Sequence, residues 1–326
     1  MKKFLILLTA MLLTITLAGC NGPDNKDENV IYTTVYPVQF IVETLVGDTV
    51  EVERVPGSTT GGHSDELYWT GKDIIDMLNS DIIFYVDAGV DNYIENASDS
   101  VFDDGDVKLF NISEFVTYAQ VCYSHDHDHE EHDEDGHEEE PVVCDENMLS
   151  DDPHFWLSPI KMLYVATVIK NELISQYPDN IELIENNFVT LSASLEKLDD
   201  DFQAMANQAV KPIITTSMIF NYIHEAYEIE IISLSTDAHN SEVVPGDVIE
   251  FVNEAVFHEI HYILYEANTN SPSGDLVLEQ LLLQDSTAEA KSLYSLGNIT
   301  QEQIDNGSTY LTLMYENLDI LKDATK

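Results

Sequence analysis

One uninterrupted helical pattern in the middle of the chain constrains its fold more than any other feature. Nine apolar residues follow one another at alternating spacings of three and four between Ile181 and Ala209. This spacing predicts a single amphipathic helix about 45 Å long at ~1.5 Å per residue. A coiled-coil dimer would give the same pattern, because its repeat is 3.5 residues. We favour a helix that crosses between two lobes of a monomer.

Short β-branched runs alternate with helical patterns on both sides of this helix, which indicates βα units. Before it we expect strands at 30–34, 50–55, 81–86 and 108–111, and helices near 38–46, 71–78 and 92–98. After it we expect strands at 213–216, 230–233, 262–265 and near Leu293, and helices at 222–227, 245–257, 274–283 and 310–322.

The predicted fold is therefore α/β, with two βα lobes of mainly parallel sheet joined by one long rigid helix. We place the N-terminal lobe at 30–178, the linking helix at 179–210 and the C-terminal lobe at 211–326. Ligands of open parallel sheets bind at the carboxyl ends of the strands, so the ligand cleft is expected between the lobes.

The first residues resemble an export signal. Lys2 and Lys3 precede an apolar run that ends in Leu17-Ala18-Gly19-Cys20, a tetrapeptide similar to a bacterial lipobox. We expect residues 1–19 to be a signal peptide, Cys20 to carry a lipid, and residues 20–29 to be a tether. An ordinary signal peptide followed by a chance cysteine is the alternative. Either way, the mature chain is expected to be extracytoplasmic, and the lipid would anchor it to the cell membrane.

The charge of the chain argues against one class of partner. There are 61 acidic residues against 13 Lys and Arg, a formal net charge of -48. Such a surface repels nucleic acid and suits cations.

The segment from His125 to Glu140 contains only His, Asp and Glu, apart from Gly136. Its histidines are His125, His127, His129, His132 and His137. Imidazole is a common zinc ligand, and neighbouring carboxylates concentrate cations, so we expect this tract to capture metal. A merely acidic, solvated loop is the alternative. Cys122 and Cys144 flank the tract and are expected to form a disulfide at its base, or else to remain free thiols that ligate metal.

Two further histidines lie in loops after predicted strands. His63 follows the small-residue run Gly57-Ser58-Thr59-Thr60-Gly61-Gly62, and His154 lies in Asp152-Pro153-His154-Phe155-Trp156-Leu157-Ser158-Pro159. With the lipobox, the His tract, the long helix and the tail through Tyr310–Leu318, these motifs resemble the metal-specific family of ABC-transporter substrate-binding lipoproteins. The resemblance implies that His63 and His154 are the metal ligands of the N-terminal lobe.

The C-terminal lobe departs from the family pattern. Ser217 and Tyr294 stand where family members usually place a His or Glu and an Asp or Glu, and neither is a zinc ligand in neutral form. His239, at a predicted strand end, is the leading substitute, and Glu266 is the second. An exposed loop residue is the alternative interpretation of His239.

The resemblance implies a non-enzymatic receptor that delivers zinc, or manganese, to the permease of an ABC importer. A metallohydrolase is the rival function, since two histidines and a water make half of a catalytic zinc site. The sequence lacks His-Glu-x-x-His, and His63-x-x-Glu66 is followed by Leu67 rather than His. A surface adhesin or metal buffer without a transport role is the third interpretation.

Overall fold

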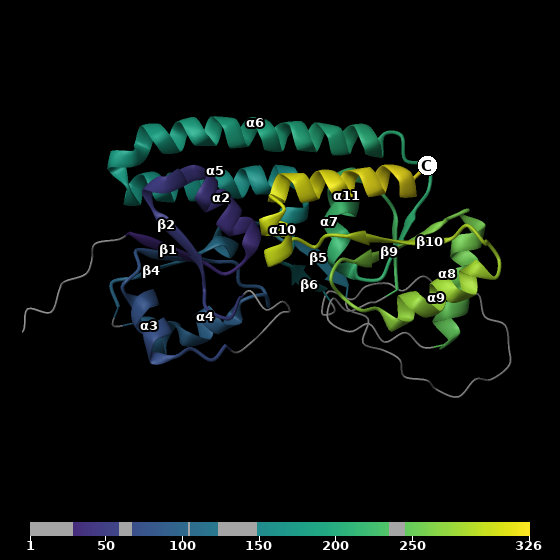
Figure 1. Ribbon diagram of the computed structural model, residues 1–326, viewed down its shortest axis with the longest axis horizontal. Coiled ribbons are helices and arrows are strands. Elements are labelled where there is room, and N and C mark those ends of the chain that lie inside the picture. Colours follow the sequence, from purple (N-terminus) through teal and green to yellow (C-terminus); the bar gives the residue numbers. More distant parts are fainter. Residues whose placement is uncertain (1–28, 59–66, 104, 123–148, 235–244) are drawn as a thin grey trace, which may run out of the picture.

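The computed structural model describes residues 29–58, 67–103, 105–122, 149–234 and 245–326. Two four-stranded sheets lie side by side beneath a layer of long helices (Figure 1). Every strand pairing within these two sheets is parallel. The predicted α/β class with two parallel sheets is therefore confirmed.

The N-terminal sheet has the strand order β2-β1-β3-β4. Its strands are β1 (Val30–Thr33), β2 (Glu51–Arg54), β3 (Ile82–Tyr85) and β4 (Lys108–Asn111), and its helices are α2 (Tyr36–Val46), α3 (Gly71–Leu78) and α4 (Asn92–Ala97). The described structure adds an antiparallel hairpin that the sequence pattern did not reveal, formed by β5 (Ala119–Cys122) and β6 (Leu149–Asp152).

The C-terminal sheet has the order β10-β9-β7-β8. Its strands are β7 (Ile213–Thr215), β8 (Ile231–Ser233), β9 (Tyr262–Glu266) and β10 (Glu289–Leu293). The helices of this half are α7 (Asn221–Tyr227), α8 (Pro245–Phe257), α9 (Pro272–Leu282), α10 (Gln301–Asp305) and α11 (Tyr310–Ala324).

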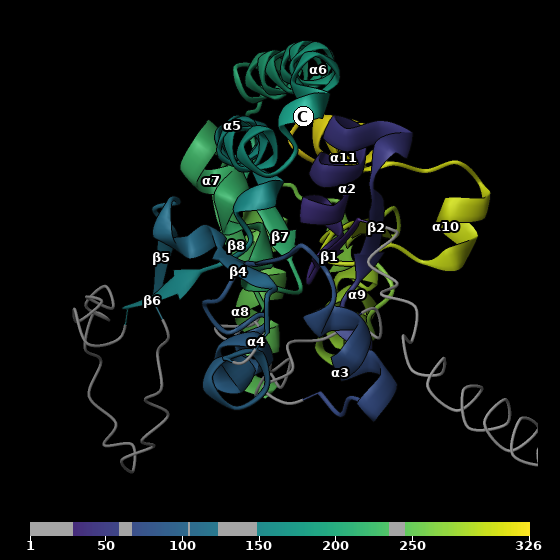
Figure 2. The ribbon, with the colours of Figure 1, turned by 90° about the vertical axis from the view of Figure 1, so that its left-hand side faces the viewer.

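Helix α6 (Ile181–Ala206) runs above both sheets, and α5 (Pro159–Gln176) lies beneath its N-terminal part and antiparallel to it (Figures 1 and 2). Helix α5 begins with Pro159 in its first turn, and the Ser158 hydroxyl caps it by accepting a hydrogen bond from the Lys161 amide. Helix α6 is one continuous element of 26 residues, roughly 39 Å long.

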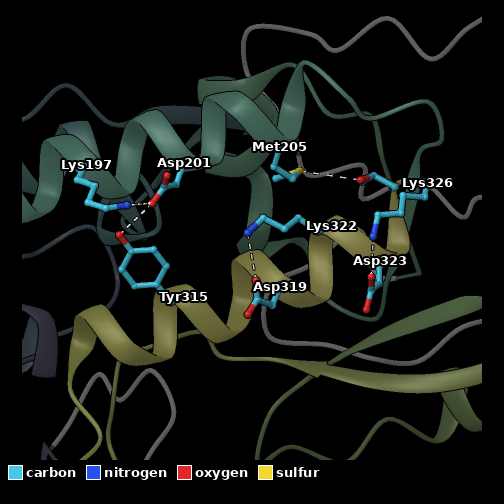
Figure 3. A network of polar contacts seen from close by, with 9 residues as sticks. Lys197, Asp201, Met205, Tyr315, Asp319, Lys322, Asp323 and Lys326 are labelled. Carbon is cyan, nitrogen blue, oxygen red and sulfur yellow. Dashed lines mark hydrogen bonds and ion pairs between the residues drawn. The ribbon is translucent and has the colours of Figure 1, made fainter.

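Helix α6 ends at Ala206, before the predicted end of the linking helix at residue 210. The backbone amides of Val210 and Lys211 instead donate to the carbonyl of Thr325, so the chain leaves the helix to pair with the end of α11. Tyr315 and Lys197 both contact the Asp201 carboxylate where α11 packs on α6 (Figure 3). The C-terminal helix is thus fixed to the linking helix.

Alternate residues of the strands fill different cores, as the period of two requires. Ile31, Phe84, Ile213 and Leu264 face the upper helix layer in one continuous cluster that covers both sheets. On the opposite faces, Tyr32 and Ile83 pack beneath the first sheet with α3 and α4, while Ile214 and Ile263 pack beneath the second with α8 and α9. The shared upper core holds the two halves together.

Candidate metal centre

His154 follows strand β6 and is almost fully buried, with 5% of its surface exposed. Its Nδ1 lies 2.7 Å from Oδ1 of Asp152, and its backbone amide donates to the same oxygen at 3.0 Å. When neutral His154 donates its Nδ1 proton to this carboxylate, its lone pair lies on Nε2. A carboxylate behind the second imidazole nitrogen is the usual support of a metal-binding histidine.

Asp152 is itself held in place by Tyr222, a residue of the C-terminal half. Its backbone carbonyl accepts a hydrogen bond of 2.7 Å from the hydroxyl of Tyr222 on α7, and that hydroxyl accepts one from the Ala119 amide. Asp152 is 3% exposed, and in the described part of the chain its Oδ2 has no hydrogen-bond partner. A buried carboxylate with one oxygen that accepts no hydrogen bond favours a cation nearby.

Glu266 is the last residue of strand β9 and comes from the C-terminal sheet. Burial raises the pKa of its carboxyl, while a hydrogen bond with the Ser295 side chain and the charge of His154 act in the opposite direction on that pKa. Glu266 therefore lies within electrostatic range of His154, although the two residues belong to different sheets. The charge of His154 thus acts on the carboxyl of Glu266, and this relates the two predicted residues.

A short chain of contacts connects the two residues. The indole nitrogen of Trp156, two residues after His154, donates to the backbone carbonyl of Ser295 at 2.7 Å. The side chain of Ser295 in turn hydrogen-bonds Glu266. Trp156 also packs edge-on against the His154 ring, with centroids 5.2 Å apart.

Ser217 and Tyr294 have other structural roles. The Ser217 hydroxyl accepts a hydrogen bond from the Ile219 amide and caps the short helix Met218–Phe220. The Tyr294 hydroxyl bonds Glu316, and burial together with that carboxylate raises its pKa. The Asn317 side chain additionally bonds both backbone groups of Tyr294 at 2.8 Å.

Several predicted site residues lie outside the described residues. They are Cys20, His63, His239, Cys144 and the tract histidines His125, His127, His129, His132 and His137. Among the residues that are described, no group of three or more His, Cys, Asp or Glu side chains is arranged to hold a metal ion. The described part of the centre is therefore the pair His154 and Glu266 with their supporting groups.

The remaining described histidines have partners of their own. The Nδ1 of His224 lies 3.0 Å from the Ile229 carbonyl oxygen, His258 pairs with Glu254 at 3.3 Å, and His261 pairs with Asp285. These contacts are separate from the pair His154 and Glu266.

Sequence reasoning missed the groups that position the pair. Asp152, two residues before His154, could have been identified from the pattern of a carboxylate beside a metal-binding histidine. Ser295 carried no such signal, because its role depends on the packing of two halves. A cavity of about 370 Å³ at the end of β3, lined by Asp87, Tyr118, Gln120 and Asp151 among others, was also missed, since it depends on the unpredicted hairpin.

Comparison with known proteins places this geometry in context. The family model described as zinc-uptake complex component A, periplasmic (ZnuA) matches residues 31–324. The zinc-binding lipoprotein AdcA of Streptococcus pneumoniae (strain ATCC BAA-255 / R6) is 28% identical over 330 residues, covering 100% of this chain and 61% of AdcA. The chain thus spans less than two thirds of that relative.

Two further proteins are matched over nearly their full length. The high-affinity zinc uptake system protein ZnuA of Bacillus subtilis is 25% identical over 318 residues, covering 95% of this chain and 94% of that protein. The crystal structure of the Zn(II)-bound ZnuA-like domain of Streptococcus pneumoniae AdcA superposes with a TM-score of 0.69 at 23% identity, covering 91% of this chain and 99% of the domain. This second similarity supports the fold.

Proposed function

The chain belongs to the ZnuA family, whose model matches residues 31–324, and we propose that it is an extracytoplasmic zinc receptor for an ABC importer. The observation that supports the proposal is that His154, backed by Asp152, lies within electrostatic range of Glu266, the last residue of β9 in the C-terminal sheet. Ligands contributed by both halves would enclose a small cation between them. The ion is the cargo of this receptor.

We assign the ligands as follows. His154 supplies Nε2, Glu266 supplies carboxylate oxygen, and His63 and His239 supply two further imidazoles from residues 59–66 and 235–244. Support for His63 comes from the family motif, whereas support for Glu266 comes from its place near His154. Imidazole nitrogens with one carboxylate match the ligands that Zn²⁺ takes in tetrahedral sites, whereas Mn²⁺ prefers more oxygen.

A receptor needs no chemistry beyond binding and release, and we propose that the protein is not an enzyme. Catalytic zinc sites keep a position open for water, whereas four protein ligands close the shell. Incubation of the zinc-loaded protein with generic ester and peptide substrates tests this point. Turnover above that of the His154→Ala variant would favour the metallohydrolase instead.

We propose that Cys20 carries the lipid anchor, that the receptor is a monomer, and that it passes zinc to a membrane permease. Among the described residues, no helix is long and apolar enough to cross a membrane. The family supports the transport role, since its members are named as zinc-uptake components.

The hairpin β5–β6 supports a capture role for the His tract. Cys122 and Leu149 are paired across the hairpin, so residues 123–148 leave and re-enter the fold at neighbouring points. We propose that the tract collects zinc from this position and that Cys122 and Cys144 close its base as a disulfide. Because Cys144 lies five residues before Leu149, this bridge would form close to the end of the hairpin.

Metal analysis of the purified mature protein tests the proposed function. After dialysis against a weak chelator, native mass spectrometry should find one zinc ion retained per chain. Retention of manganese in preference to zinc, or of no metal, would contradict the proposal.

A further inference from the structure

Residues 295–298, which follow β10 after Tyr294, contact three separate elements of the N-terminal half. The Ser295 carbonyl accepts from the Trp156 indole at 2.7 Å, the Gly297 carbonyl from the Tyr36 amide at 3.0 Å, and Asn298 Oδ1 from Arg54 at 3.0 Å. We call residues 295–298 the cross-lobe segment. Through the Ser295 side chain, the same segment bonds Glu266.

The Arg54 guanidinium is the point where this segment meets the loop that leads to His63. Besides Asn298, its Nη2 donates to the carbonyl of Thr34 at 2.6 Å and to that of Ser58 at 3.2 Å. Ser58 is the last described residue before residues 59–66. One nitrogen atom thus joins the ends of β1 and β2, the start of the His63 loop and the C-terminal half.

Burial makes this contact costly to break. It lowers the pKa of Arg54 to about 10, so the guanidinium stays charged at neutral pH. A buried cation that loses an acceptor is left with unsatisfied hydrogen-bonding capacity. Nearby, Leu296 is 2% exposed and has a positive φ of 64°, a conformation that a bulky residue keeps only when its surroundings hold it.

We propose that Arg54 and Asn298 are positioning residues of the metal site. Neither is a metal ligand. Their contact holds the beginning of the His63 loop in a fixed position relative to the segment that orients Glu266, and so sets the distance between ligands from the two halves. This inference rests on the proposed zinc site, and it adds a determinant of zinc affinity that lies outside the ligand set.

The test is competitive zinc titration of the full mature chain against a fluorescent chelator. Asn298→Ala removes the acceptor and should weaken zinc binding by about tenfold or more, which is typical of lost support behind metal ligands. Asn298→Asp keeps an oxygen acceptor for Arg54, so its affinity should stay within about threefold of wild type. Asn253→Ala, on the exposed face of α8, is the matched control and should bind like wild type.

The variant Asn298→Asp distinguishes a positioning role of Asn298 from a role in packing alone. Wild-type affinity in Asn298→Ala would overturn the inference, and so would equal losses in Asn298→Ala and Asn298→Asp. The metal-free protein should melt at a lower temperature in Asn298→Ala than in Asn298→Asp, because only the first variant leaves the buried Arg54 without this acceptor. Zinc affinities are therefore compared at a temperature where both variants are folded, and there they should differ clearly. His154→Ala, measured alongside, distinguishes the two proposals: if it binds zinc like wild type, the site itself is misplaced and the inference falls with it.

Discussion

The Nδ1 atom of His154 lies 2.7 Å from Oδ1 of Asp152, and both side chains are buried at the end of β6. Asp152→Asn keeps the shape but removes the charge that fixes the imidazole. We expect zinc affinity to fall by roughly 10–100-fold. Calorimetric titration measures this, with Asp151→Asn, an exposed neighbour, as the control. Equal affinities in the two variants would mean that the buried carboxylate does not support the ligand.

Removing both N-terminal ligands should abolish tight zinc binding. His63→Ala combined with His154→Ala leaves only ligands from the C-terminal half, which cannot complete a tetrahedral shell. Calorimetry on the double variant is the measurement. Near-wild-type affinity would move the main site elsewhere.

The C-terminal half should contribute through both Glu266 and His239. Glu266→Gln and His239→Ala should each weaken zinc by at least the roughly 10–100-fold that disturbing a supporting group costs. His224→Ala and His258→Ala serve as controls, because these histidines contact Ile229 and Glu254 instead. If only Glu266→Gln has an effect, the site consists of His63, His154 and a carboxylate, and the assignment of His239 is wrong.

Deletion of residues 125–140 should lower the total number of zinc ions bound while leaving one tight site. The tract supplies many weak ligands, whereas the proposed cleft supplies a fixed set. Equilibrium dialysis at low and high zinc distinguishes the two classes. Loss of the tight site alone would instead place tract histidines in the cleft.

Zinc affinity should decrease as the pH falls, because the metal competes with protons for its ligands. Burial raises the pKa of Glu266, so its carboxyl in the metal-free protein takes up a proton at higher pH than an exposed Glu does. Glu266→Gln removes this competition and should flatten the dependence of log affinity on pH in the range where Glu266 titrates. An unchanged slope would argue that Glu266 does not bind the ion.

Local patterns sufficed to predict most of the fold. The periodicity between Ile181 and Ala209 identified α6, and short apolar runs located the eight strands of the two parallel sheets, because the repeat of a helix or a strand is a local property of the sequence. The hairpin β5–β6 was missed because one of its strands, Leu149–Asp152, has two acidic residues and little apolar character. Its pairing depends on a partner strand that is separated from it by 26 residues.

The residues of the site were harder to predict from the sequence than the fold was. His154 and Glu266 were identified as strand-end residues, but Glu266 was ranked below His239 because nothing local indicates that it faces the other sheet. Ser295, Arg54 and Asn298 were not identified, since their roles arise from hydrogen bonds between segments up to 244 residues apart. Such contacts depend on the packing of the two halves, which periodicity does not encode.

Anomalous diffraction at the zinc edge, on crystals of the zinc-loaded variant lacking residues 125–140, tests the central claim most directly. The account predicts one strong peak that contacts Nε2 of His154 and the carboxylate of Glu266, with imidazoles completing the shell. A peak bound by His154 without Glu266, or located away from both residues, would contradict it.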